Sequence, residues 1–312
     1  MKKLLVSVAM ITYNHEEFII EAIESILMQV VNFDIELIVV NDNSPDNTDS
    51  IIKNLLKSHP KSSYIRYIKH KENIGMIPNF VFALNQCQGK YTAICEGDDY
   101  WIDSYKLQKQ VDLLEKSTKY AGCGSNAIIK YENSNKLQEN FRDFKSDKVF
   151  YVNKFLSHRP FHTASFIFRT KVLKQLSFPT DITSGDRLLF IVIALTGPVY
   201  YINEVMCCYR KNDTGVSSRV TAEMLMRDIK TADWLKENYP EFQKSRYLSF
   251  LHRTILSYST ELRLGQMFKH ILFYFILSFS FFPLNLKSLL GFAVRELPAI
   301  LVKTAKTELN RL

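Results

Sequence analysis

Three acidic residues crowd into one short turn of this sequence. In the segment CEGDDYW, Glu96, Asp98 and Asp99 directly follow YTAI, an apolar tetrapeptide typical of a buried strand. Like charges at this spacing repel one another unless a cation lies between them. Mg²⁺ and Mn²⁺ prefer such oxygen ligands, and one or two carboxylates commonly suffice when substrate phosphates and water complete the shell. The turn therefore predicts a divalent-metal site.

A second interpretation of the same turn is structural. One carboxylate just before a helix that begins near Trp101 would cap the helix and favourably meet its dipole. A cap needs a single acid, whereas this turn has three, so we favour the metal site. Trp101 itself is expected to pack beneath the turn rather than to stack on a substrate.

The elements that must position these acids alternate between strands and helices. Strands are expected at residues 6–14, 35–42, 64–70 and 90–99, and helices at 16–30, 44–59 and 78–89. This alternation indicates parallel βαβ units with right-handed crossovers. In such sheets ligands bind beyond the carboxyl ends of the strands, where TYNHE, NDNSPDN, KENIG and EGDD all fall. We therefore expect one site shared by these four strand ends.

The rest of the chain extends this α/β domain and then becomes helical. A helix is expected at 103–117, strands at 120–131, 161–169 and 199–210, a polar loop at 132–148 and a helix at 184–197. From about residue 222 only helical patterns occur, at 223–239 and 242–264, before an apolar C-terminal segment. We therefore divide the chain into an α/β domain, residues 1–221, and a helical region, residues 222–312.

The C-terminal segment combines apolar helices with basic flanks. The run from Ile271 to Pro283 is unbroken and rich in aromatics, but it is shorter than the roughly 20 residues that a membrane-spanning helix needs. Lys269 and Lys287 flank it, and Arg295 follows. This pattern favours helices that lie in the membrane interface. A helical cap buried on the α/β domain is the alternative.

The composition of the chain limits the kinds of partner and cofactor that we expect it to bind. The chain has 312 residues, a formal charge of +8 and a pI near 9.1, so anionic partners such as nucleotide phosphates or anionic lipid are expected. No zinc-finger or RNP-like pattern is present, so nucleic acid is not expected. The five cysteines show no paired spacing, which favours small buried side chains in a reducing compartment over disulfides or a zinc site. TYNHEEF contains no glycine, which argues against both a nucleotidyltransferase and a dinucleotide oxidoreductase.

Four motifs together carry a family resemblance. TYNHEEFIIEAIESILMQ, VVNDNSPDNT, KENIGMIPN and CEGDDYWIDSYKLQKQ, in this order and spacing, resemble the family 2 glycosyltransferases of the GT-A fold over roughly residues 4–210. The resemblance implies an α/β fold with a mostly parallel sheet flanked by helices, followed here by a helical C-terminal extension. It also implies a nucleotide-sugar donor lying across the strand ends and Mg²⁺ or Mn²⁺ as cofactor.

The resemblance also implies roles for individual residues. The implied nucleotide-sugar contacts are Thr12, Tyr13, Asn14, Asp42, Asn73, Gly75, Asp98 and Arg210. For the metal it implies Asp98 first and Asp99 second, with Glu96 standing where the family usually has aspartate. Asp186, in SGDRLLF, matches the base that takes the proton of the acceptor hydroxyl, although a helix cap is the alternative.

Two softer assignments concern the acceptor side. His162 is a candidate to face the acceptor or the metal. Arg210 or Lys211 would steady the diphosphate as a fixed cation. Where the family often has a histidine after this Tyr-Arg segment, the sequence has Lys211 and Asn212, which leaves a third protein ligand of the metal open. A single carboxylate base with no second nucleophile implies direct displacement with inversion at the anomeric carbon.

The sequence thus predicts a metal-dependent inverting glycosyltransferase at the inner face of the cytoplasmic membrane. It would move a sugar from a nucleotide-diphosphate donor, a UDP-sugar, to a glycan or lipid-linked acceptor in surface polysaccharide synthesis. The alternative is a non-catalytic, membrane-associated assembly protein on a degenerate transferase fold. The donor sugar, acceptor and linkage depend on residues 132–185, where the sequence gives no chemical pattern.

Overall fold

The chain folds into two compact units. The computed structural model describes residues 4–132, 134–175, 178–212, 215, 219–281 and 286–309. Unit 1 comprises Met1–Thr180 and Gly185–Ser218, and unit 2 comprises Asp181–Ser184 and Arg219–Leu312. The boundary between the units, before Arg219, lies near the boundary that the sequence places after residue 221. Unit 2 also includes the short segment Asp181–Ser184, which the sequence places in the α/β domain.

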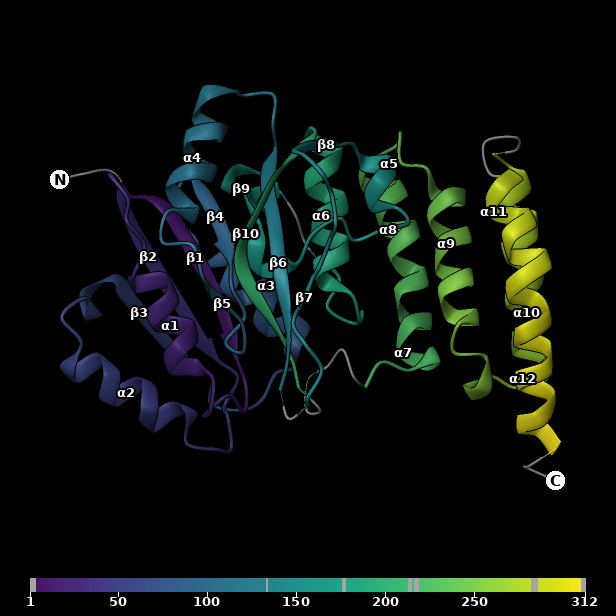
Figure 1. The fold of residues 1–312 in the computed structure, drawn as a ribbon, viewed down its shortest axis with the longest axis horizontal. Coiled ribbons are helices and arrows are strands. Elements are labelled where there is room, and N and C mark those ends of the chain that lie inside the picture. The colour runs from purple at the N-terminus through teal and green to yellow at the C-terminus, as the bar shows by residue number, and fades with distance from the viewer. Residues whose placement is uncertain are drawn as a thin grey trace. The chain divides into compact units, whose positions relative to one another are not determined.

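Unit 1 is built on one mixed sheet (Figure 1). Its strands are β1 (Leu4–Thr12), β2 (Asp34–Asn41), β3 (Ile65–Lys69), β4 (Tyr91–Ile94), β5 (Tyr100–Trp101), β6 (Gly122–Tyr131), β7 (Glu139–Asn140), β8 (Lys148–Phe150), β9 (Ile167–Arg169) and β10 (Val199–Lys211). Along the sheet the order is β3-β2-β1-β4-β9-β6-β10-β5, while β7 pairs with β6 and β8 with β10.

The long strands pair in parallel and the short ones in antiparallel fashion. β1 is parallel to β2 and β4, β2 to β3, and β10 to β6. The short strand β9 runs antiparallel between β4 and β6, and β5 runs antiparallel to β10. Because β1 to β4 are parallel, their carboxyl ends meet at one edge of the sheet. The predicted α/β fold with a largely parallel, helix-flanked sheet is confirmed.

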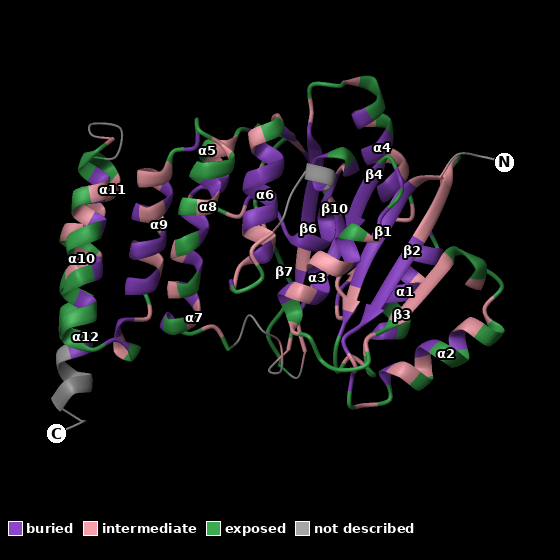
Figure 2. Ribbon diagram, turned by 180° about the vertical axis from the view of Figure 1, so that it is seen from behind, coloured by how far each residue is buried: buried purple, intermediate pink, exposed green. Residues whose placement is uncertain are grey.

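Helices cover both faces of this sheet (Figure 1). They are α1 (Ile19–Leu27), α2 (Thr48–Ser58), α3 (Met76–Asn85), α4 (Lys106–Lys116), α5 (Val152–Phe155) and α6 (Gly185–Thr196). Ile23 of α1 and Val111 of α4 are buried in the same apolar cluster as Val8 of β1, so these two helices share one face. Helix α6 is buried along most of its length (Figure 2), which fixes its first turn firmly in the domain.

Unit 2 contains only helices among its described residues. They are α7 (Ala222–Arg227), α8 (Thr231–Asn238), α9 (Lys244–Leu256), α10 (Leu264–Phe279), α11 (Leu286–Gly291) and α12 (Leu297–Leu309). A π-helical turn, Phe292–Glu296, joins α11 to α12. The helix expected at 223–239 is interrupted at Asp228, whose carboxylate accepts the N–H groups of Thr183 and Ser184. Tyr274 and Phe292 lie at the centre of a separate apolar core.

Two further predictions from the sequence can be compared with the structure. Residues 161–169 form a strand only at β9, because the His162 side chain accepts the N–H of Ala164 and starts a 3₁₀ turn at Thr163–Ser165. All five cysteines are buried and free, as predicted. Within the described residues no helix has the length and apolarity needed to span a bilayer. Pro283, where the apolar run ends, lies outside the described residues.

Candidate active site

The acidic turn lies against the end of β1. The N–H of Gly97 donates to the carbonyl of Ile11 at 2.9 Å, and the N–H of Cys95 donates to that of Ala9 at 3.1 Å. A side chain at position 97 would place its Cβ 2.9 Å from the Thr12 hydroxyl oxygen and from Nδ1 of His15. Glycine is therefore required at this position, and the turn is packed directly against the polar end of β1.

Asp98 is partly exposed to solvent. Its side chain retains 22% of its exposure, and Nε2 of His15 lies 3.9 Å from Oδ2. Nδ1 of His15 is 3.2 Å from the Thr12 hydroxyl, which orients the ring. Nothing in the sequence pattern singles out His15, because its contact with Asp98 depends on the pairing of β1 with β4.

Glu96 has a carboxyl oxygen without a partner. Its Oε2 atom is buried and makes no hydrogen bond within the described part of the chain. Burial, followed by the nearby charge of Asp98, raises the pKa of Glu96 to about 8. Buried polar atoms are rarely left unpaired, and a cation would supply the missing partner. Asp98 and Glu96 therefore fit a divalent ion, and a diphosphate and water would supply its other ligands.

The described residues contain no complete protein cage for a metal. Nowhere among them do three or more His, Cys, Asp or Glu side chains form a metal-binding group.

Asp99 is engaged inside the protein. Its Oδ1 accepts the N–H of Arg210 at 2.9 Å, and Oδ2 lies 3.4 Å from Nδ1 of His162. That ring nitrogen accepts the N–H of Ala164 at 3.3 Å and is therefore the unprotonated nitrogen of the ring. Burial, with Asp98 and Glu96 close by, raises the pKa of Asp99 well above its ordinary value. These contacts make Asp99 an anchor of the turn, and its role as second metal ligand stays a prediction.

Arg210 lies beneath the turn rather than in open space. Its guanidinium donates to the carbonyl of Asp98 at 2.8 Å and to Glu132 at 3.0 Å, and it pairs with Glu21. The group also stacks over the ring of Tyr100, 4.3 Å from its centroid. The guanidinium thus ties β10 and α1 to the backbone of the acidic turn. Its direct contact with a diphosphate remains a prediction, as does that of Lys211.

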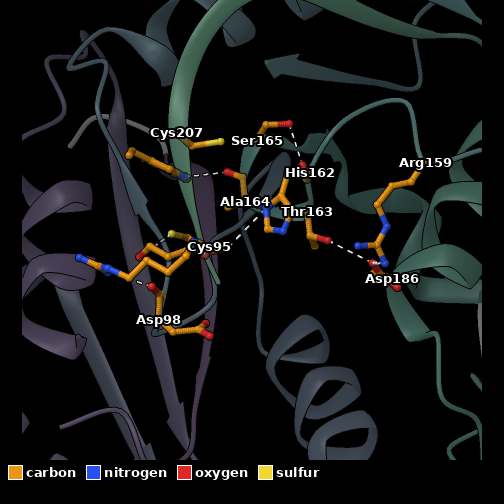
Figure 3. Close-up of polar contacts among 12 residues, drawn as sticks. Cys95, Asp98, Arg159, His162, Thr163, Ala164, Ser165, Asp186 and Cys207 are labelled. Carbon is orange, nitrogen blue, oxygen red and sulfur yellow. Dashed lines mark hydrogen bonds and ion pairs between the residues drawn. The ribbon is translucent and has the colours of Figure 1, made fainter. Parts of the chain in front are cut away.

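Asp186 opens helix α6, as the sequence predicts. Its Oδ2 accepts the hydroxyl of Thr163 at 3.2 Å and forms an ion pair with Arg159, while Oδ1 accepts the N–H of Arg187 at 2.7 Å (Figure 3). Burial raises the pKa of the Asp186 carboxyl, but Arg159 and Arg187 outweigh it, so the pKa lies below its ordinary value. The carboxylate is therefore ionised at neutral pH. Arg159 lies in a segment without a recognisable pattern, and sequence reasoning missed it.

One short segment connects the acidic turn to Asp186. His162 contacts Asp99 and stacks on Tyr209 at 4.0 Å between ring centroids, while the next residue, Thr163, binds Asp186 (Figure 3). Burial lowers the pKa of His162 to about 3, so its ring is neutral. A neutral, buried ring suits a positioning role better than a charged contact with an acceptor. The pair His162 and Thr163 thus contacts both halves of the site from one turn.

The ends of β1 and β2 form the other side of the site. Asp42 is buried, and its two oxygens accept the N–H groups of Ile74 and Gly75 at 2.8 and 2.9 Å. Asn73 accepts the same Gly75 N–H at 3.0 Å, and Gly75 has a φ of 93°, a backbone conformation that favours glycine. Asp42 therefore holds the loop that precedes α3, and its contact with a base or ribose stays a prediction.

The remaining predicted nucleotide contacts follow β1 directly. Thr12 is buried, whereas Tyr13 is exposed. Asn14 has a φ of 59°, and its N–H donates to the hydroxyl of Ser44 at 3.1 Å. Thr12, Asn14 and Asp42 thus come together at one edge of the sheet, as the parallel strand order requires.

The sheet and its flanking helices have the arrangement of the GT-A fold, with carboxylates at the strand ends. Residues 7–177 match the sequence model of the family described as Glycosyl transferase family 2. This span is more than half of the chain, so the protein belongs to that family. The resemblance stated from the sequence is confirmed.

Individual relatives agree with this assignment. An uncharacterized protein of Mycobacterium tuberculosis is 32% identical over 213 residues, which make up 67% of this chain and 60% of that protein. The chain thus spans less than two thirds of the length of this relative. The minor teichoic acid biosynthesis protein GgaB of Bacillus subtilis is 26% identical over 242 residues, 77% of this chain and 26% of that protein.

Solved structures show the same fold. S. aureus TarS 1–349 in complex with UDP-GlcNAc is similar with a TM-score of 0.64 and 17% identity, covering 86% of this chain and 79% of that one. The mannosyltransferase PcManGT of Pyrobaculum calidifontis, in complex with GDP-Man and Mn²⁺, is similar with a TM-score of 0.57 and 17% identity, covering 98% and 84%. At this level of identity the likeness concerns the fold alone.

Proposed function

We propose that this chain is an inverting glycosyltransferase that uses a nucleotide-diphosphate sugar, a UDP-sugar, as its donor. The acceptor would be a glycan or a lipid-linked glycan in surface polysaccharide synthesis, at the inner face of the cell membrane. The observation that carries the proposal is the pair of unlike carboxylate sites in unit 1. One is the acidic turn after β4, and the other is the ionised Asp186 at the start of α6.

The two sites divide the reaction between them. Asp98, with Glu96 beside it, would hold Mg²⁺ or Mn²⁺ together with the diphosphate. When bound, such a cation neutralises the charge that develops on the departing nucleotide diphosphate. Asp186 would accept the proton of the acceptor hydroxyl as that oxygen attacks the anomeric carbon. Because one carboxylate acts as base and no second nucleophile takes part, attack comes from the face opposite the leaving group and inverts the configuration.

The relatives support the class of donor and the pathway. TarS is solved with UDP-GlcNAc, and PcManGT with GDP-Man and Mn²⁺, so proteins of this fold bind nucleotide-sugars and a divalent metal. GgaB is named for teichoic acid biosynthesis, which supports a surface polymer as the acceptor. The lowered pKa of Asp186 and the unpaired oxygen of Glu96 favour an active enzyme over the non-catalytic assembly protein.

The proposal is tested by nucleotide release from UDP- and GDP-sugars with Mn²⁺ or Mg²⁺. We expect turnover by the wild type with at least one donor. Asp98→Ala should lose metal-dependent turnover while its circular dichroism spectrum stays unchanged. Asp186→Asn should keep the Kd for the donor and lose at least about 100-fold in kcat, because general-base catalysis contributes roughly that factor or more.

The two variants separate the roles of the two carboxylates. Full activity of Asp98→Ala would show that the turn holds no essential metal. A collapse of donor affinity in Asp186→Asn would make Asp186 a binding residue and place the base elsewhere. A wild type that neither turns over any donor nor binds UDP in a metal-dependent way would favour the non-catalytic alternative.

A further inference from the structure

Helix α10 of unit 2 has an apolar face that is open to solvent. Phe268, Leu272, Ile276 and Phe279 are each between 56% and 61% exposed. Their spacing of four, four and three residues places them on one side of the helix. The opposite side carries buried Met267 and Tyr274, which belong to the core of unit 2. The exposed apolar side chains of α10 are therefore not part of the core of unit 2.

The helix formed by α11, the π-helical turn and α12 repeats this arrangement. Leu286, Leu290 and Val294 are exposed at intervals of four residues, and Leu301 and Val302 follow further along. Leu289 and Phe292 occupy the buried side, where the Phe292 ring lies 4.4 Å from that of Tyr274. Both helices of the pair thus bury one apolar face and expose another (Figure 2). We call the two exposed stripes together the outer face of unit 2.

An exposed apolar surface like the outer face usually marks an interaction site. Single exposed apolar side chains are normal on soluble proteins, but contiguous apolar patches on monomers rarely exceed a few hundred Å². Two adjoining helices with large aliphatic and aromatic side chains along their exposed sides go beyond isolated positions.

Most of the charged residues in these helices are basic. Lys269, Lys287, Arg295 and Lys303 are exposed. From residue 264 to residue 309 the sequence has two acids, Glu296 and Glu308, against five lysines and arginines. Glu296 is already paired with Arg253 of α9. The two helices that carry the outer face therefore contain more basic than acidic residues.

We propose that the outer face of unit 2 docks on the surface of a bilayer that contains anionic lipid. Apolar side chains would enter the boundary between headgroups and acyl chains, while the lysines and arginines contact lipid phosphates. Anionic lipid explains the apolar stripes and the excess of cations together. A second copy of the chain would bring like charges against each other, which disfavours that occupant. The proposal deepens the membrane location given in the proposed function, on which it rests, but its evidence comes from unit 2 alone and does not require transferase activity.

The apolar part is tested by flotation of the full chain with vesicles of phosphatidylcholine with and without phosphatidylglycerol. We expect the wild type to float with the phosphatidylglycerol vesicles. A Phe268→Ser/Leu272→Ser/Ile276→Ser variant should bind at least about tenfold more weakly, because it removes apolar area that would enter the interface. The matched control is Val30→Ser/Leu137→Ser, two exposed apolar residues of unit 1, which should bind like the wild type.

The contribution of the basic residues is tested by a charge-reversal variant and its control. Lys269→Glu/Lys287→Glu/Arg295→Glu should lose about tenfold or more in affinity for phosphatidylglycerol vesicles, since each basic residue near an anionic surface contributes to binding. Lys57→Glu/Lys116→Glu, at exposed positions of unit 1, should leave the affinity unchanged. Circular dichroism should show folded protein in every variant, because all the replaced side chains lie at the surface.

Three outcomes would overturn the proposal. One is a wild type that does not float with anionic vesicles, and another is a triple serine variant that floats as well as the wild type. The third is a dimer in analytical ultracentrifugation that the triple serine variant converts to a monomer, because the outer face would then pair two copies. Nucleotide release measured on the same samples distinguishes a failure of docking from a failure of the transferase assignment.

Discussion

Among single residues, Arg159 controls the charge of the proposed base. Asp186 is faced by Arg159, Arg187, His162 and Glu96. Burial raises its pKa, and the two arginines more than reverse this, so the carboxylate stays ionised to a lower pH than usual. The base is active only when ionised. Removing Arg159 should therefore raise the pKa of Asp186 and leave less of the active form in mildly acidic solution.

We expect the Arg159→Met substitution to shift the pH dependence of kcat/KM. The acidic limb of kcat/KM should move to higher pH by about one unit, which is the usual effect of one close arginine on a carboxylate. Arg159→Lys should restore much of the wild-type profile, because it keeps the positive charge. A binding titration of UDP should give similar Kd values for all three proteins. An acidic limb that does not move in Arg159→Met would show that another group sets the protonation of the base.

The sequence pointed to Asp186 but not to Arg159, the arginine that pairs with it. The places of Asp98 after β4 and of Asp186 in the first turn of α6 were predictable, because each lies at the end of an element whose local pattern is clear. Arg159, His15 and the inward contacts of Asp99 were not, because each depends on segments that meet only through the folded sheet. A sequence read one segment at a time cannot supply those pairings.

At the scale of elements, local periodicity predicted the parallel half of the sheet. β1 to β4 and the helices between them follow from alternating apolar patterns and their helix starts. The antiparallel pairing of β5 and β9 was not predicted. A strand was expected at residues 161–169, but β9 covers only its last three residues, β5 has only two, and the places of both are set by pairing with β10, β4 and β6. Such short strands carry no periodic signal, so only long-range register defines them.

The turn after β2 provides a test at this scale. Asn43 has a φ of 57°, and it follows Asp42, whose carboxylate holds the loop before α3. Asparagine tolerates this left-handed conformation better than residues such as alanine, whereas glycine adopts it without strain. We expect Asn43→Ala to lower the free energy of unfolding by about 1 kcal/mol and Asn43→Gly to change it by less.

Urea titration of the wild type and the two Asn43 variants measures this difference. The glycine variant is the control, because it removes the same side chain but accepts the backbone angle. Equal loss in both variants would mean that the side chain of Asn43, rather than its conformation, stabilises the turn.

For the whole molecule, the division into two units separates catalysis from docking. The proposed catalytic residues Asp98 and Asp186 lie in unit 1, and the outer face lies in unit 2. Each unit has its own apolar core, one around the sheet and one around Tyr274 and Phe292. Two cores with separate side chains should unfold as two cooperative transitions rather than one.

Calorimetry with a ligand and a core variant can assign these transitions. UDP with Mn²⁺ should raise the Tm of the unit 1 transition, because a ligand stabilises only the unit that binds it. Phe292→Leu removes part of a fully buried ring and should destabilise unit 2 by about 1–2 kcal/mol, lowering the other Tm by roughly 5–10 °C. Nucleotide release below both transitions should be unchanged. If Phe292→Leu instead shifted the transition that UDP stabilises, the two cores would fold as one, and docking and catalysis would be energetically coupled.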